Sequence, residues 1–338
     1  MHRLLLAFLS LFSLPLLCLA THGDSFDPFR RHHQRSQSKP RNIKYCLQDK
    51  YRGENILNSW KFFSAPDPTH GMVDYQSRED AITHGLAYVQ KDGTTVLAVD
   101  NVTELPPGKN RASVRISSPK TYNQGLFIAD FWAMPFGCSV WPAWWSVGPN
   151  WPNGGEIDVL EGVHNSVNNQ LTLHTSSGCS LDTEVQPQVS GSISGHTNCA
   201  SSGADNTGCA FIDSDCRSYG RDFNLNGGGV YAHLWDSEGI KAWFFSRGEI
   251  PKDILEGEPK PELWRKPVAF WKNGESCDIG KHFYEHELVI DTTLCGDWAG
   301  ATYEVAGCPG RCTDAVTNPR NFDNARWKIN YIAVYQPA

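Results

Sequence analysis

The sequence predicts an all-β fold built from two large sheets packed face to face. The 338 residues include 12 Trp, 30 Gly and 20 Pro, residue types that are enriched in strands or in turns. From about residue 43 onward, short strand-like runs alternate with turn residues, and no strand–helix alternation occurs. Many antiparallel strands in one domain over residues 42–338 favour a two-sheet sandwich over a barrel.

The first 20 residues have the features of a secretion signal. Met1-His2-Arg3 gives a basic start, and an apolar stretch follows that ends at Ala20. The alternative is an uncleaved membrane anchor, but Pro15 interrupts a stretch that is already short for a bilayer-spanning helix. We therefore expect residues 1–20 to be removed and the mature chain to be secreted, with no membrane segment.

Residues 21–41 are polar and basic and are expected to form a flexible arm, which is either trimmed at Arg30-Arg31 or serves as a tether. Residues 1–41 contain six Lys or Arg and two Asp, so the rest of the chain is more acidic than the overall net charge of −7. An acidic surface argues against nucleic acid as the ligand, because phosphate binding requires a basic face. A neutral substrate fits better.

Several runs are expected to be strands, and two pairs of them to be hairpins. Residues 86–90 and 94–99 flank a Lys-Asp-Gly turn, and residues 229–235 and 239–245 flank an Asp-Ser-Glu turn. The stretch 176–220 is rich in Cys, Ser and Gly and has little apolar periodicity, so a disulfide-pinned loop region is expected there. Further candidate strands are residues 113–117, 126–131, 170–174 and 327–335.

The cysteines predict disulfides. Ten remain once Cys18 is removed with the leader, an even number in an oxidising compartment, and the sequence leaves their pairing open. Cys308 and Cys312 are close enough in sequence to suggest zinc, but no Cys or His pair at finger spacing completes such a site. Asn101-Val102-Thr103 is an N-glycosylation acceptor, which is consistent with secretion.

Residues 154–162, Gly-Gly-Glu-Ile-Asp-Val-Leu-Glu-Gly, place three carboxylates among apolar residues. On a helix, Glu156 and Glu161 would lie about 140° apart around the axis and could not act on one bond. On a strand, Glu156 and Asp158 share a face, and Glu161 joins them only if one residue is bulged out near Val159-Leu160. We predict that bulge, which makes the spacing compatible with a retaining glycosidase, whose carboxyls lie about 5–5.5 Å apart. An exposed acidic strand and a calcium site are the alternatives.

Tryptophan is concentrated just before these carboxylates, in Trp141-Pro-Ala-Trp144-Trp145 and Trp151-Pro. Aromatic rings stack on the apolar faces of pyranose rings. We assign Trp144 and Trp151 to a substrate cleft, whereas Trp141 and Trp145 can each be either core or cleft.

The run over residues 125–162 resembles the active-site region of glycoside hydrolase family 16, and more narrowly that of the fungal laminarinases and mixed-linkage glucanases. Glu156, Asp158 and Glu161 match the family signature Glu-x-Asp-x-x-Glu in its bulged form. The resemblance implies that Glu156 is the nucleophile, that Asp158 assists it and that Glu161 is the acid/base.

Two later segments extend the resemblance, which involves nearly all of residues 42–338. His174, in Gln-Leu-Thr-Leu-His-Thr, matches a cleft histidine, and Trp298, in Gly-Asp-Trp-Ala-Gly, matches a substrate-stacking tryptophan. The fold that the resemblance implies is a concanavalin-like jelly-roll sandwich with an open cleft on its concave sheet.

The function implied is a retaining endo-β-1,3(4)-glucanase that hydrolyses β-1,3 or mixed β-1,3/1,4 glucans without a cofactor or metal, as a monomer. Two alternatives remain open. A cell-wall transglycosylase would use the same site with a sugar as acceptor, and a non-catalytic glucan-binding lectin would use the same fold. The sequence does not separate laminarin from lichenan and cereal glucan as substrates.

Overall fold

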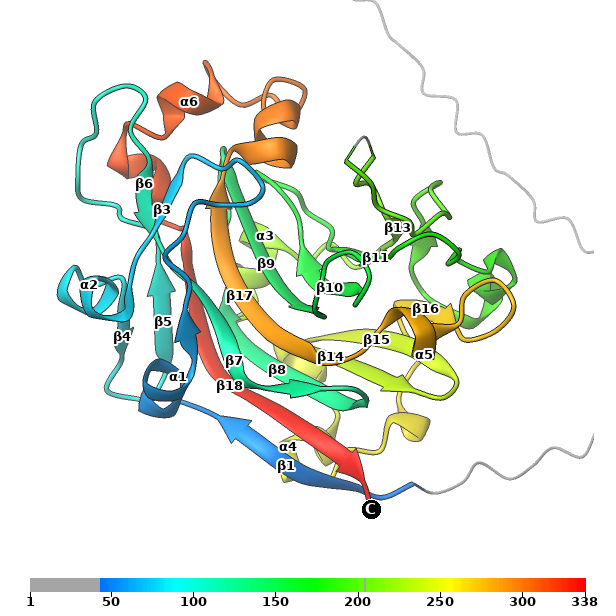
Figure 1. Cartoon of the computed structure of the whole chain (residues 1–338). Helices are drawn as coiled ribbons and strands as arrows, with labels where there is room; N and C mark the ends of the chain where they lie inside the picture. The colour runs from blue at the N-terminus through cyan, green and yellow to red at the C-terminus, as the bar shows by residue number, and fades with distance from the viewer. Residues whose placement is uncertain (1–42, 204) are drawn as a thin grey trace, which may run out of the picture. The chain divides into compact units, whose positions relative to one another are not determined.

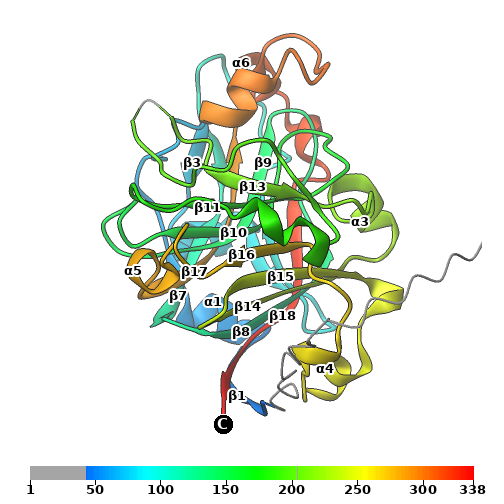
Figure 2. The same ribbon diagram turned by 90° about the vertical axis from the view of Figure 1, so that its right-hand side faces the viewer.

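The computed structural model describes residues 43–203 and 205–338, so the predictions for residues 1–41 lie outside the described part. Two eight-stranded antiparallel sheets dominate it, and Figures 1 and 2 show them as layers. Sheet A has the order β16-β15-β14-β8-β18-β5-β4, with β1 paired to β18, and sheet B has the order β12-β13-β11-β10-β9-β17-β7-β2. The all-β two-sheet prediction is confirmed.

The strands of sheet A are β1 (Tyr45–Tyr51), β4 (Ala87–Val89), β5 (Thr95–Ala98), β8 (Gly125–Ala133), β14 (Gly229–Asp236), β15 (Gly239–Ser246), β16 (Ala269–Lys272) and β18 (Arg326–Pro337). Those of sheet B are β2 (Lys61–Phe62), β7 (Arg115–Tyr122), β9 (Val140–Val147), β10 (Glu156–Glu161), β11 (Gln170–His174), β12 (Ser192–Ile193), β13 (Cys209–Ile212) and β17 (His286–Leu294). A small parallel pair joins β3 (Val73–Tyr75) to β6 (Arg111–Ser113).

Helices are short and lie in the connections. The α-helices are α1 (Glu54–Ser59), α2 (Arg78–Thr83), α3 (Gly220–Leu225), α4 (Lys252–Glu256), α5 (Ile279–His282) and α6 (Cys312–Ala315). The other helical turns are η1 (Thr183–Gln188), η2 (Arg247–Glu249), η3 (Pro261–Leu263), η4 (Gly296–Gly300) and η5 (Pro319–Phe322). In the part of the chain that is described, no helix is long and apolar enough to cross a membrane.

The main core lies between the two sheets. On β8, Phe127, Ala129 and Phe131 alternate with residues of the other face and belong to this core. The ring of Phe131 in sheet A meets the edge of Trp144 in sheet B, with centroids 6.1 Å apart. The alternation of side chains along the strands thus gives each sheet one apolar face, and these two faces pack against each other.

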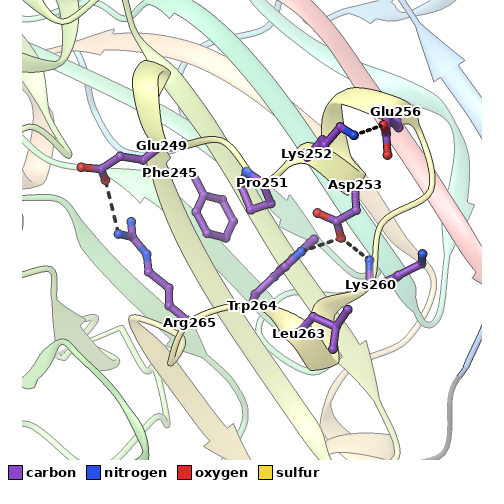
Figure 3. A pocket seen from close by; sticks show the side chains of 10 residues that line it. All are labelled: Phe245, Glu249, Pro251, Lys252, Asp253, Glu256, Lys260, Leu263, Trp264 and Arg265. Atoms are coloured by element: carbon purple, nitrogen blue, oxygen red, sulfur yellow. Dashed lines mark hydrogen bonds and ion pairs between the residues drawn. The ribbon is translucent and has the colours of Figure 1, made fainter.

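The outer face of sheet A carries a second apolar cluster, which includes Leu126 and Ile128 of β8. The segment 247–265 lies along this cluster and adds Trp264, which meets Trp243 and Phe245 edge to face. Figure 3 shows the shallow pocket of about 450 Å³ that this segment forms around Trp264. Several of its polar groups are paired: Trp264 Nε1 donates to Asp253 Oδ2 at 2.8 Å, and Lys252 and Glu256 form an ion pair.

Both predicted hairpins are confirmed as β4–β5 and β14–β15. The prediction of a loop region over residues 176–220 is wrong in part, because β12 and β13 lie within it and β13 extends sheet B beside β11. Phe211 of β13 packs in the core with its ring edge-on to Trp271, and this one buried aromatic residue gave no periodic signal in the sequence.

Disulfides join Cys138 to Cys308, Cys179 to Cys277, Cys199 to Cys209 and Cys295 to Cys312. The expected disulfides are thus present, and of the ten cysteines considered, Cys46 and Cys216 are free and exposed in the described structure.

Candidate active site

The predicted bulge is present on β10. Against β9, Asp158 pairs with Trp145 and Leu160 pairs with Trp144, so Val159 is the extra residue. Against β11, the register also shifts between Asp158 and Glu161. One inserted residue shifts the side-chain alternation of the residues that follow it. Because of this shift, Glu161 lies on the same face as Asp158.

The register with β9 shows that the three carboxylates share a face. Glu156, Asp158 and Glu161 lie opposite Val147, Trp145 and Ala143, which are alternate residues of one strand. Their neighbours Ile157 and Leu160 point the other way, into the core. We call this side of sheet B, away from the core, the carboxylate face.

Each catalytic candidate on the carboxylate face has a specific polar neighbour. Trp151 Nε1 donates to Glu156 Oε2 at 2.6 Å, and Trp141 Nε1 donates to Glu161 Oε1 at 2.8 Å. His174 Nε2 lies 3.4 Å from Asp158 Oδ2, while His174 Nδ1 bonds Ser201 Oγ at 2.9 Å. These contacts orient all three carboxyls.

Burial and mutual repulsion raise the pKa values of the three carboxyls. Burial, followed by the charge of Asp158, raises the pKa of Glu156 to about 8. Burial raises the pKa of Glu161 to about 7, against the lowering effect of the Trp141 indole. Burial and then the charge of Glu161 raise the pKa of Asp158 well above its usual range. Ionisation of one carboxyl holds protons on the others, so the face can present a carboxylate and a proton donor together.

Asp158→Asn is expected to stabilise the protein at high pH and to slow catalysis. The raised pKa means that the folded state keeps a proton that the unfolded chain releases above about pH 4, so this group's contribution to stability is lost as the pH rises. Removing the group should therefore raise the free energy of unfolding at pH 8 and raise it by less at pH 4. Urea unfolding at both pH values checks this, and an equal change at both would contradict it. The activity–pH profile should change along with its maximum, because Asp158 influences the pKa of Glu156.

The tryptophans divide between the core and the carboxylate face. The prediction for Trp144 is wrong: its side chain is 1% exposed and packs in the core, because its neighbour Trp145 takes the outward position on β9. Trp151 is 43% exposed and lies beside Glu156 through its indole bond. Trp298, on η4, meets Trp141 edge to face at 5.7 Å and so lies near Glu161.

The sequence reasoning missed a charged pair on the carboxylate face. Asp291 of β17 lies opposite Ala143, which in turn lies opposite Glu161, so the three residues form one row across the sheet. Arg115 Nη1 is 3.8 Å from Asp291 Oδ2, and its guanidinium lies over the rings of Trp145 and Phe63. Burial raises the pKa of Asp291 to about 7, whereas Arg115 lowers it. The two residues are far apart in the sequence and no motif links them, so the sequence gives no sign that they form a pair.

One group of side chains could also hold a cation. The ligand atoms of Glu156, Asp158 and His174 lie within 4.8 Å of one another. All three already belong to the carboxylate face, so a cation there would compete with the chemistry of the carboxyls.

The family-model comparison matches residues 60–335 to the catalytic domain of glycoside hydrolase family 16, of the XgeA-like type. A probable glycosidase of Schizosaccharomyces pombe is 42% identical over 296 residues, which cover 86% of this chain and 69% of that protein. A probable endo-1,3(4)-β-glucanase of Aspergillus niger is 41% identical over 303 residues, covering 86% of this chain but only 40% of that longer protein.

Solved structures agree with the family match. Laminarinase 16A of Phanerochaete chrysosporium, a family 16 enzyme seen with two β-glucans in its donor and acceptor sites, aligns with a TM-score of 0.82 and 41% identity over 87% of this chain and 100% of that one. An elongating family 16 β-1,3-glucosyltransferase aligns with a TM-score of 0.81 and 40% identity, over 86% of this chain and 100% of that one. With its two sheets, its bulged carboxylate strand and these matches, the chain belongs to glycoside hydrolase family 16.

Proposed function

We propose that this chain is a retaining endo-β-1,3(4)-glucanase and that Glu156, Asp158 and Glu161 are its catalytic carboxylates. The observation that carries the proposal is the bulge at Val159, which turns three carboxyls of one short strand to the same face. The names of the Aspergillus relatives and the laminarinase with bound glucans support β-glucan as the substrate.

In the proposed mechanism, Glu161 gives its proton to the glycosidic oxygen while Glu156 attacks the anomeric carbon and forms a covalent glycosyl-enzyme. Glu161, now ionised, then takes a proton from the water that releases the sugar. In the free protein, burial favours the protonated form of Glu156, whose pKa of about 8 is above that of Glu161, about 7. The Trp151 indole opposes this effect and stabilises the ionised form of Glu156, which the attack requires together with a proton on Glu161. Asp158 interacts with both Glu156 and Glu161. Its own ionisation helps to keep one Glu protonated while the other is ionised.

A polysaccharide panel tests this function. Purified protein should release reducing ends from laminarin, lichenan or cereal glucan, and the first product should be the β-anomer. Saturable binding without release would instead identify a lectin. Transfer of the glycosyl group to a labelled oligosaccharide in preference to water would identify a transglycosylase.

Trp151→Ala or Trp298→Ala should weaken productive glucan binding by about 1–3 kcal/mol, the range for removing a partly buried aromatic contact. Trp151 is 43% exposed and Trp298, on η4, is half-buried, and neither belongs to the main core, so folding should be mostly retained. Kinetics with laminari-oligosaccharides, together with thermal unfolding, check this. A large loss of thermal stability with unchanged kinetics would assign that tryptophan to packing.

We further propose that residues 1–20 are a signal peptide, that residues 21–41 are an arm ahead of the catalytic domain 42–338, and that the mature protein is a secreted monomer. The four disulfides support an oxidising compartment. Asn101 is partly buried and its Nδ2 donates to Asp323 Oδ1 at 3.0 Å. A glycan on this nitrogen replaces one of its two hydrogens, so the bond is kept only where the remaining N–H is the donor. Mass spectrometry of the secreted protein reads the N-terminus, the disulfides and the glycan together.

A further inference from the structure

The bulge that brings Glu161 to the carboxylate face leaves a gap in the sheet. Between β10 and β11, Asp158 pairs with Thr172 and Glu161 pairs with Gln170, so three residues on one strand advance while two advance on the other. A bulge disrupts the ladder locally and leaves backbone groups that need other partners.

The side chain of Asn169 supplies those partners. Its Nδ2 donates to the carbonyl oxygen of Val159 at 2.8 Å, and its Oδ1 accepts from the N–H of Glu161 at 2.9 Å. One amide thus acts as a peptide group would, offering a donor and an acceptor at the same place in the ladder.

Asn169 is itself held firmly. The residue is fully buried, its backbone N–H donates to Ser218 Oγ at 2.9 Å, and its carbonyl oxygen accepts from the N–H of Asp213 at 2.9 Å. Glu161 is consequently fixed at two points, by Asn169 at its backbone and by the Trp141 indole at its carboxyl.

We propose that Asn169 is a positioning residue for catalysis, which sets the place of the Glu161 carboxyl through the backbone of the bulge. The proposal rests on the proposed role of Glu161 as acid/base. Small displacements of a catalytic group cost large factors in rate, about 10²-fold for 1 Å. Loss of the amide contacts should therefore impair proton donation more than any other step.

The test compares two substrates that differ in their need for an acid. A laminari-oligosaccharide has a poor leaving group and needs the proton, whereas the dinitrophenyl β-glycoside of laminaribiose has a leaving group that departs without it. For Asn169→Ala, kcat/KM should fall about 10- to 100-fold on the oligosaccharide and less than about threefold on the aryl glycoside. Asn169→Leu keeps the shape of the side chain, removes both hydrogen bonds and adds no charge beside Glu161, so it provides the same reading if the alanine variant does not fold.

Asn168→Ala is the matched control. Asn168 is the adjacent residue, and its amide donates to the carbonyl oxygen of Asp213 rather than to β10. This variant should leave the ratio of the two kcat/KM values as it is in the unaltered protein. An equal loss on both substrates for the Asn169 variants, or the same selective loss for Asn168→Ala, would overturn the proposal.

Glu161→Ala in the same assay separates this proposal from the function on which it rests. If Glu161 is the acid/base, its variant shows the same selective loss on the oligosaccharide in larger measure. If Glu161→Ala loses both substrates equally, the assigned role of Glu161 fails, whatever the Asn169 variants do.

Discussion

Glu156→Ala is expected to abolish glucan hydrolysis and, with azide and an activated aryl β-glycoside, to release an α-glycosyl azide. Without the carboxylate no covalent intermediate forms, and azide displaces the leaving group in one inverting step. Product analysis by NMR reads the anomer directly. The shortened side chain leaves Trp151 without its acceptor, so folding of the variant should be checked by circular dichroism.

Glu161→Ala should fail in a different way and serves as the counterpart. Glu156 still forms the glycosyl-enzyme, and azide, which needs no base, then attacks from the opposite face and gives the β-azide. The loss on polysaccharide should be about 10²- to 10⁴-fold, the usual contribution of acid–base catalysis. Swapped azide anomers would reverse the two roles, and an α-anomer as the first product of the unaltered protein would remove the whole assignment.

Trp144→Ala is expected to give the largest loss of stability, about 3–5 kcal/mol in the free energy of unfolding. The side chain is 1% exposed and fills the space between the sheets against Phe131, so its removal leaves a cavity in the main core. Denaturant unfolding measures the loss, and kcat/KM of the folded fraction should change little.

Trp145→Ala provides the comparison, because it removes the same ring from the next position of β9. Trp145 lies opposite Asp158 on the carboxylate face and stacks on the Arg115 guanidinium. Its removal should cost less stability and more activity than the removal of Trp144. Equal losses of stability in the two variants would contradict the register, which places Trp144 in the core and Trp145 on the carboxylate face.

The sequence was sufficient to predict the carboxylate strand and its bulge, because Glu156 and Glu161 are an odd number of residues apart and only an extra residue brings them together. It was not sufficient to orient β9. Trp144 and Trp145 are adjacent and chemically identical, so their order in the chain cannot show which one points outward. That choice depends on the pairing of β9 with β10 and β17.

The remaining site residues left no local signal, for two physical reasons. Arg115 and Asp291 meet only because β7 and β17 are neighbours in sheet B, although the two residues are 176 positions apart in the sequence. Asn169 acts on backbone groups that become available only once the strand has bulged. Rules based on residue spacing describe side chains on one regular strand. They do not predict contacts between distant strands or contacts to the backbone of a bulge.

The strand order also determines which strand pairs can form while the chain is being synthesised. The segment with β9, β10 and β11 contains the three catalytic candidates and can pair locally as it leaves the ribosome, but β9 has its other edge against β17, which is synthesised much later. In sheet A, the central β18 is the last of the strands that the structure describes, and it pairs with β1, β5 and β8. Until these two strands emerge, both sheets have open edges, and the Trp-rich edge of β9 is free to pair with other chains. Loss of β18 would therefore leave an aggregating chain rather than a shortened enzyme.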